Sequence, residues 1–143
     1  MKLLNKYKIK LSLITFFLVY SVSALADVAV IVNSANTAAI DEGDIPRIFL
    51  GKIKSYSTGD KVTLVNLNSD QSARAEFEDK VLNKSATQIK AYWSKLMFSG
   101  KAKPPKELEN DKAVIDFIQS NPGAIGYISA ESVTDSVKVI KTY

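Results

Sequence analysis

The 143-residue sequence contains no cysteine and no histidine. Without cysteine there is no disulfide, no thiolate nucleophile, no zinc–cysteine site and no lipid attached to an N-terminal cysteine. Without histidine, the usual general base, the Ser-His-Asp arrangement and most transition-metal sites are excluded as well. No paired constellation of carboxylate, serine, lysine or tyrosine side chains replaces them. The sequence therefore predicts a protein that is not an enzyme and has neither a metal nor a cofactor.

The first 26 residues have the pattern of a secretory signal peptide. Four lysines occupy the start, residues 11–22 are an apolar run, and Ala24-Leu25-Ala26 is a small-x-small cleavage signal. An apolar run of this length is short for a membrane span. We expect cleavage after Ala26, which leaves residues 27–143 as one periplasmic domain without stable membrane insertion. An uncleaved N-terminal anchor is the alternative interpretation.

The charges are unevenly distributed. The formal net charge of +4 belongs wholly to the predicted signal peptide, so residues 27–143 are neutral and nothing indicates nucleic-acid binding. Within this neutral part, residues 80–106 contain seven lysines and no acidic residue. Two interpretations remain open: a face that docks onto an acidic surface, or an ordinary solvated helix face followed by a soluble connector.

Hydrophobic patterns predict an α/β protein with strands alternating with helices. Strands are expected at residues 28–32, 61–67, 124–128 and 137–142, and helices at residues 41–50, 70–82 and 110–119, the last of them capped by Asn110 or Asp111. A further helix begins at a capping box formed by Ser85 and Gln88 and ends at Gly100. Residues 101–106, with two prolines, are expected to be an extended connector. One face of the helix after Ser85 is predicted to pack in the core, through Ile89, Tyr92, Trp93, Leu96 and Met97.

Two polar turns follow predicted strands, at residues 33–37 and 68–72. Backbone N–H groups at a strand-to-helix turn can hold an anion, and Ser69 and Ser72 add hydroxyl donors to the second turn. The alternative is that Ser69 or Asp70 only caps a helix. Both turns follow strands that are predicted to be parallel, so we expect them to lie at the same edge of the sheet, where ligands of α/β proteins commonly bind.

Three motifs follow one another along the chain: IFLGKI at residues 48–53, Ser69-Asp70-x-Ser72 at a helix start, and NPGAIGY at residues 121–127. Together they resemble the phosphate-type periplasmic substrate-binding proteins of ABC transporters, in particular short single-lobe relatives. The resemblance extends from residue 28 to about residue 128. It implies a single lobe of the type II periplasmic-binding-protein fold, with a small, mostly parallel sheet flanked by about four helices.

The anion-binding signature of that family is only partly present. The signature Arg-Ser-Asp-Gly-Ser-Gly-Thr aligns with residues 68–74, where Ser69, Asp70 and Ser72 match. Asn68 stands in place of the arginine, and the two glycines are also replaced. Asparagine lacks the charged fork with which arginine holds an oxyanion. Arg74 is the candidate to replace that charge.

The resemblance implies an exported protein that binds phosphate or a similar small oxyanion and is connected with ABC transport. A single lobe supplies one wall of a cleft, so binding is expected to be weak or completed by a second copy, an ABC permease or another envelope protein. The expected ligand-binding residues are Ser69, Asp70, Ser72 and Arg74, with Asn33, Ser34 and Asn68 as further donors. The alternative is a ligand-free interaction or regulatory module of the envelope that uses the lysine-rich face of residues 80–106.

Overall fold

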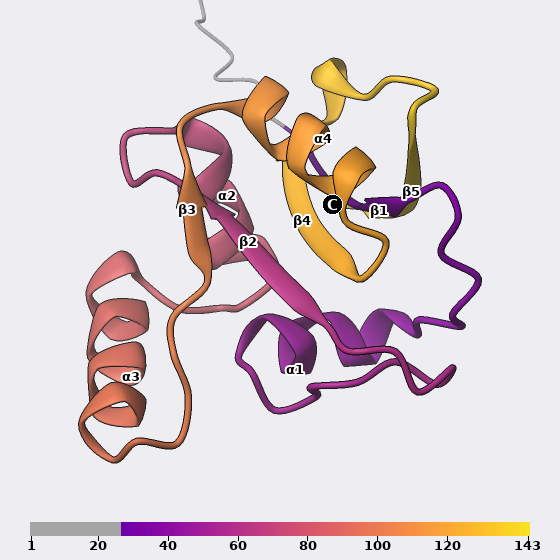
Figure 1. Cartoon of the computed structure of the whole chain (residues 1–143). Helices are drawn as coiled ribbons and strands as arrows, with labels where there is room; N and C mark the ends of the chain where they lie inside the picture. The colour runs from indigo at the N-terminus through magenta and orange to yellow at the C-terminus, as the bar shows by residue number, and fades with distance from the viewer. Residues whose placement is uncertain (1–26) are drawn as a thin grey trace, which may run out of the picture.

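The computed structural model describes residues 27–143, and the predicted signal peptide lies outside this part of the chain. The described residues form one five-stranded sheet in the order β3-β2-β4-β1-β5 (Figure 1). Its strands are β1 (Val28–Asn33), β2 (Thr63–Leu67), β3 (Lys106–Leu108), β4 (Ala124–Ser129) and β5 (Val137–Thr142). The helices are α1 (Ile45–Phe49), α2 (Ser72–Lys80), α3 (Ala86–Phe98) and α4 (Asp111–Ser120), with short 3-10 turns at Glu42–Asp44 and Ala130–Ser132. The predicted α/β class is confirmed.

One strand of the sheet runs against the other four. β2 pairs in parallel with both β3 and β4, whereas β1 pairs antiparallel with β4 and β5. The carboxyl end of β1 therefore lies at the opposite edge of the sheet from the carboxyl end of β2. The expectation that the turns at residues 33–37 and 68–72 share one edge was wrong, because a run of apolar residues specifies burial but not strand direction.

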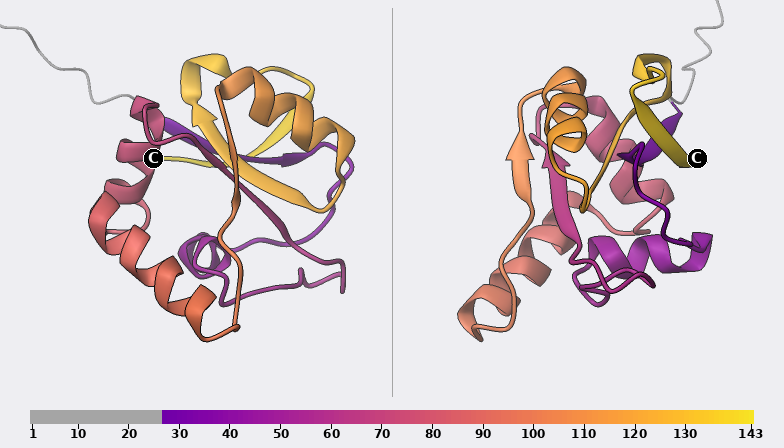
Figure 2. Two further views of the ribbon diagram at one scale, coloured as in Figure 1. Left: turned by 60° about the vertical axis from the view of Figure 1, so that its left-hand side comes forward. Right: turned by 45° about the vertical axis from the view of Figure 1, so that its right-hand side comes forward.

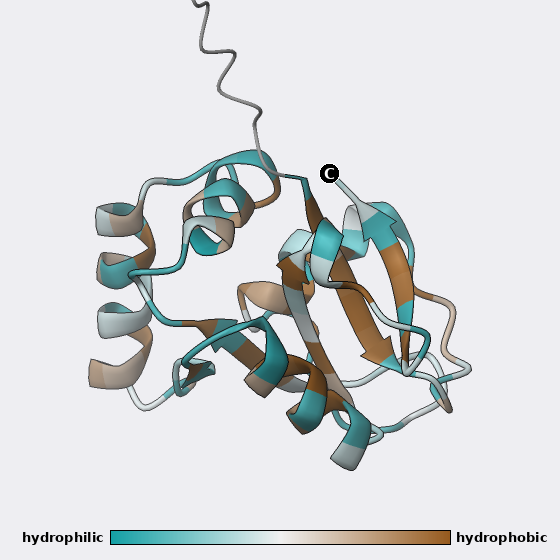
Figure 3. Cartoon of the chain, turned by 90° about the horizontal axis from the view of Figure 1, so that it is seen from above, coloured by the Kyte–Doolittle hydropathy of each residue, from teal (hydrophilic) through white to brown (hydrophobic). Residues whose placement is uncertain are grey.

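β1 is the centre of the core. All six of its residues are buried, which matches the continuous apolar run in its sequence. Two helical layers cover the sheet. A Cβ at Gly126 would meet Val114 and Ile118 of α4, so α4 packs on that face of β4. The next residue, Tyr127, stacks on Phe77 of α2 with ring centroids 3.8 Å apart, so α2 covers the other face. Figure 3 shows hydrophobic strands inside and hydrophilic helix surfaces outside.

Helix α3 extends away from the sheet, and the connector at residues 101–105 returns beside it to β3 (Figure 2). The helix is attached through a small separate cluster formed by Leu50, Ile89 and Trp93. Gly51, with φ +69, follows the end of α1 and lies against Trp93. A Cβ added at Gly51 would lie 3.1 Å from the indole ring. The predicted apolar face of α3 is thus buried in its first half, whereas Met97 is 52% exposed near its end.

The helix starts agree with the sequence patterns at two of three sites. The capping box at Ser85 and Gln88 is present, and Asn110 caps α4 by accepting a hydrogen bond from the N–H of Ala113. At α2 the prediction was wrong: the N-cap is Gln71, whose side chain makes no capping hydrogen bond. The end of the predicted connector also differs, since Lys106–Leu108 forms the edge strand β3. Among the described residues, no helix has both the length and the apolar character that a membrane span needs.

Candidate functional site

The turn of residues 68–72 connects the carboxyl end of β2 to α2. The N–H of Asn68 donates to the carbonyl of Leu108 at 2.9 Å, which ties the turn to β3. Ser69, Asp70 and Ser72 are exposed. Among the described residues, the hydroxyls of Ser69 and Ser72 have no hydrogen-bond partner. No side chain caps the first turn of α2 either. The turn therefore presents polar donors to solvent at a helix start.

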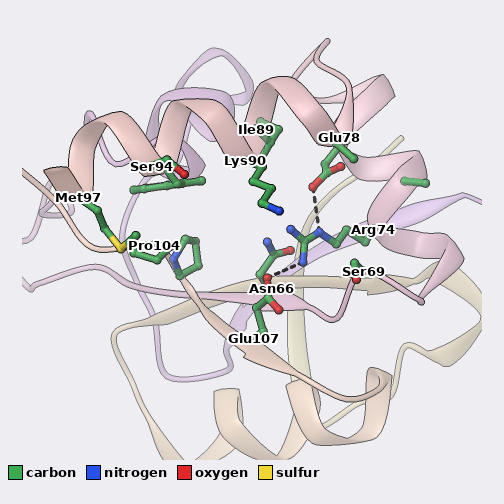
Figure 4. Close-up of a pocket in the computed structure, with 14 residues that line it drawn as sticks. Asn66, Ser69, Arg74, Glu78, Ile89, Lys90, Ser94, Met97, Pro104 and Glu107 are labelled. Carbon is green, nitrogen blue, oxygen red and sulfur yellow. Dashed lines mark hydrogen bonds and ion pairs between the residues drawn. The ribbon is translucent and has the colours of Figure 1, made fainter.

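Arg74 lies beside this turn, in the first part of α2, and its guanidinium binds other groups of the protein through Nε and Nη1. Nε donates to Glu78 at 2.9 Å, and Nη1 donates to the carbonyl of Leu67 at 2.9 Å and to Glu107 at 2.7 Å (Figure 4). Burial alone would lower the pKa of Arg74, but its hydrogen bonds and ion pairs with Glu107 and Glu78 outweigh burial and raise that pKa. Arg74 thus links α2 to the ends of β2 and β3.

This arrangement decides the electrostatics of the candidate site. Glu78 is buried, with 5% of its side chain exposed, whereas the side chain of Glu107 is 51% exposed. Two carboxylates, those of Glu78 and Glu107, therefore contact the one guanidinium. A phosphate that approached Arg74 would have to displace a carboxylate or bind beside it. Arg74 therefore lies at the edge of the sheet where it was expected. Because its charge is neutralised, it does not replace the charge of the arginine that the family signature has at the position of Asn68.

The turn opens into a groove of about 550 Å³ between α2, α3 and the strands β2 and β3 (Figure 4). The end near the turn is polar, formed by Asn66, Ser69 and the Arg74 ion pairs. The other end is apolar, formed mainly by Trp93, Met97 and the prolines at 104 and 105. Behind the polar end, the buried hydroxyl of Tyr127 donates to the side-chain oxygen of Asn66, and burial raises the pKa of Tyr127 well above its usual range.

Asn33 and Ser34 do not belong to this site, because they follow β1 at the opposite edge. The amide of Asn33 is buried and donates to the carbonyls of Ile118 at 2.8 Å and Gln119 at 3.0 Å. Its own oxygen accepts from the N–H of Ala35. Asn33 therefore holds the C-terminal end of α4, and Ser34 is an exposed turn residue. Neither residue lines the groove beside residues 68–72, which corrects their predicted role.

Sequence reasoning missed the two glutamates that neutralise Arg74. Glu78 could have been found, because it follows Arg74 by four residues on the same helix face. Glu107 could not, because the sequence does not show that β3 lies beside β2. The apolar end of the groove was also missed, since Trp93 and Met97 were expected only as core residues.

The fold belongs to a known structural class. No protein-family model and no curated protein match the sequence. Among solved structures, it is similar to an ABC-type phosphate transport receptor of Vibrio cholerae (TM-score 0.63, 22% identity, covering 82% of this chain and 47% of that one). It is also similar to a phosphate ABC transporter substrate-binding protein of Clostridium perfringens with bound phosphate (TM-score 0.62, 21% identity, 82% and 46%). A third similar structure is PstS of Borrelia burgdorferi (TM-score 0.59, 17% identity, 81% and 47%).

The chain spans about half the length of these solved structures. At these identities the similarity shows the fold: residues 27–143 have the architecture of a single lobe of a phosphate-binding protein. The resemblance found in the sequence motifs is therefore confirmed at the level of the fold.

Proposed function

We propose that this chain is an exported binding-protein lobe that holds a small oxyanion, such as phosphate, weakly at the turn of residues 68–72. The observation that carries the proposal is the start of α2. Its first turn has no side-chain cap, and the neighbouring hydroxyls of Ser69 and Ser72 have no partner among the described residues. A helix N-terminus with free N–H groups and hydroxyls is suited to a tetrahedral oxyanion. The fold shared with phosphate receptors supports phosphate as the oxyanion to test.

Two features support low affinity for the lobe alone. Arg74 is neutralised by Glu78 and Glu107, so this guanidinium offers an oxyanion little unpaired charge. The turn is also open on one side, because the described residues form a single lobe and leave the ligand in contact with water. High-affinity binding therefore requires a second wall, which we assign to another copy, an ABC permease or another envelope protein.

Amide chemical shifts of residues 27–143 in a phosphate titration test this proposal. We expect saturable shifts at millimolar phosphate, concentrated on the N–H groups of Ser72 and Ala73, because these are the free donors of the first turn. Sodium chloride at matched ionic strength separates specific binding from screening.

Ser72→Ala is the informative variant and Ser34→Ala the matched control at the opposite edge. Loss of one hydroxyl donor should weaken phosphate binding about fivefold to tenfold, whereas the control should bind as the unchanged chain does. Two results would rule out an oxyanion site at this turn. One is amide shifts of equal size in phosphate and in chloride, and the other is an equal loss of phosphate binding in Ser72→Ala and Ser34→Ala.

A further inference from the structure

The C-terminal end of α3 carries an exposed apolar tip. Phe98 is 94% exposed and Met97 is 52% exposed, and both lie in the last turn of the helix. Elsewhere in the described chain, only Val139 among the large apolar residues is comparably open, at 39%. Because α3 projects from the sheet, its end is at the periphery of the molecule (Figure 2). Single exposed apolar residues are common, so the exposure of Phe98 points to an apolar contact only together with the charges around it.

Lysines surround this tip. Lys95, Lys101 and Lys103 are exposed, and none of them makes an ion pair within the described residues. Lys54 joins them, since its Nζ donates to the carbonyl of Lys101 at 3.4 Å. The two segments that meet here, residues 45–59 and 80–106, contain no acidic residue. The surface around Phe98 is therefore strongly electropositive although residues 27–143 as a whole are neutral.

The positive surface continues along the connector. A cavity of about 430 Å³ on the other side of residues 101–105 is lined by four lysines and by no carboxylate, the lysines being Lys54, Lys61, Lys103 and Lys106. A lysine near the C-terminus of a helix stabilises the helix through its interaction with the helix dipole, and this accounts for the position of Lys95. It does not account for the lysines of the loops, nor for the exposure of Phe98.

The shape of this surface distinguishes two kinds of acidic partner. A protein partner buries a broad, complementary interface with several apolar anchors. Here Phe98 is the one highly exposed aromatic residue at the end of a projecting helix, with Met97 beside it at the end of the groove. The cations nearby are long side chains that make no ion pair within the described residues. An aromatic residue that enters the headgroup region while lysines contact anionic headgroups fits a fluid lipid surface.

We infer that the end of α3, with Phe98 as apolar anchor and Lys54, Lys95, Lys101 and Lys103 as cationic contacts, docks reversibly on an anionic lipid surface. This surface contact is independent of the oxyanion site, which lies at the other end of the groove. It involves no membrane span, and it places the lobe with its projecting helix toward the bilayer.

Co-sedimentation with lipid vesicles tests the inference on residues 27–143, which contain the whole sheet and its core. We expect binding to phosphatidylcholine vesicles that contain phosphatidylglycerol, weaker binding to pure phosphatidylcholine, and release by high salt. Phe98→Ala should lower the partition coefficient about tenfold because it removes most of a buried aromatic side chain. Replacing Lys95, Lys101 and Lys103 by glutamine should lower it about 100-fold, at about fivefold for each lysine.

Matched controls change the same residue types on other faces. Val139→Ala removes an exposed apolar side chain from β5, and the triple replacement of Lys112, Lys138 and Lys141 by glutamine removes the same charge; both should leave partition within about twofold. Equal loss in the control variants, or no binding to phosphatidylglycerol vesicles, would overturn the inference. Lysine-dependent binding to soluble polyglutamate without vesicle binding would assign the face to an acidic polypeptide instead, and would overturn it too.

Discussion

Replacing Arg74 by methionine measures how far this guanidinium holds α2 onto the edge of the sheet. Its partner Glu78 has only 5% of its side chain exposed, so the variant leaves a buried carboxylate without a counter-ion. Removing one partner of a buried pair costs about 3 to 5 kcal/mol. The 51% exposed Glu107 can hydrate and adds little to this cost. We therefore expect a loss of about 3 kcal/mol, which lowers the midpoint of urea unfolding by about 2 M at a slope of about 1.5 kcal/mol per molar.

A double replacement separates the loss of the ion pair from the loss of packing. Arg74→Met combined with Glu78→Met removes both charges and keeps unbranched apolar side chains, so it should recover most of the stability. Lys112→Met is the matched control, because it breaks the exposed pair with Asp116 at the same spacing and should cost less than about 0.5 kcal/mol. A loss below about 1 kcal/mol for Arg74→Met would refute the structural role of Arg74, and no recovery in the double variant would refute the unpaired carboxylate as the cause of the loss.

Three further predictions concern stability measured by urea unfolding. Gly51→Ala should cost about 1 to 2 kcal/mol and change Trp93 fluorescence, because φ is +69 and the added Cβ would lie 3.1 Å from the indole; unchanged emission would contradict this. Asn33→Ala should cost about 2 kcal/mol, since it removes the donor to two carbonyls at the end of α4. Burial raises the pKa of Tyr56 to about 12 and that of Tyr127 further. Both remain neutral in the folded chain while they ionise in the unfolded chain, so stability should fall above about pH 10, by about 1.4 kcal/mol per pH unit for each, and Tyr→Phe variants should flatten this fall.

Local patterns predicted the local structure. The capping box at Ser85 and Gln88, the cap at Asn110 and the last strand at Val137–Thr142 appear where the sequence placed them. Each of these features depends on interactions between residues only a few positions apart, so a short stretch of sequence is enough to predict it. The edge strand Lys106–Leu108 was not predicted, because its three residues include two charges and its pairing with β2 is decided elsewhere in the chain.

The candidate site was predicted only in the part that a single segment forms. Ser69 and Arg74 lie at one edge as expected, since both belong to the segment from the end of β2 to the first turn of α2. The role of Arg74 depends on Glu107, and the exclusion of Asn33 depends on the direction of β1. Both roles depend on contacts between segments far apart in the sequence. The hydrophobic pattern of one strand shows neither which strands are its neighbours nor in which direction it runs.

The position of β1 has a consequence for how this chain folds. Its two neighbours are β4 and β5, and Val28 exchanges backbone hydrogen bonds with Tyr143 at 3.2 and 2.9 Å. Pairing between such distant segments closes long loops, which makes folding slow. β1 precedes both of its partner strands in the chain, so during synthesis it cannot pair until β4 and β5 have been added. Until then it is an exposed β-prone segment, which raises the risk that the incomplete chain aggregates.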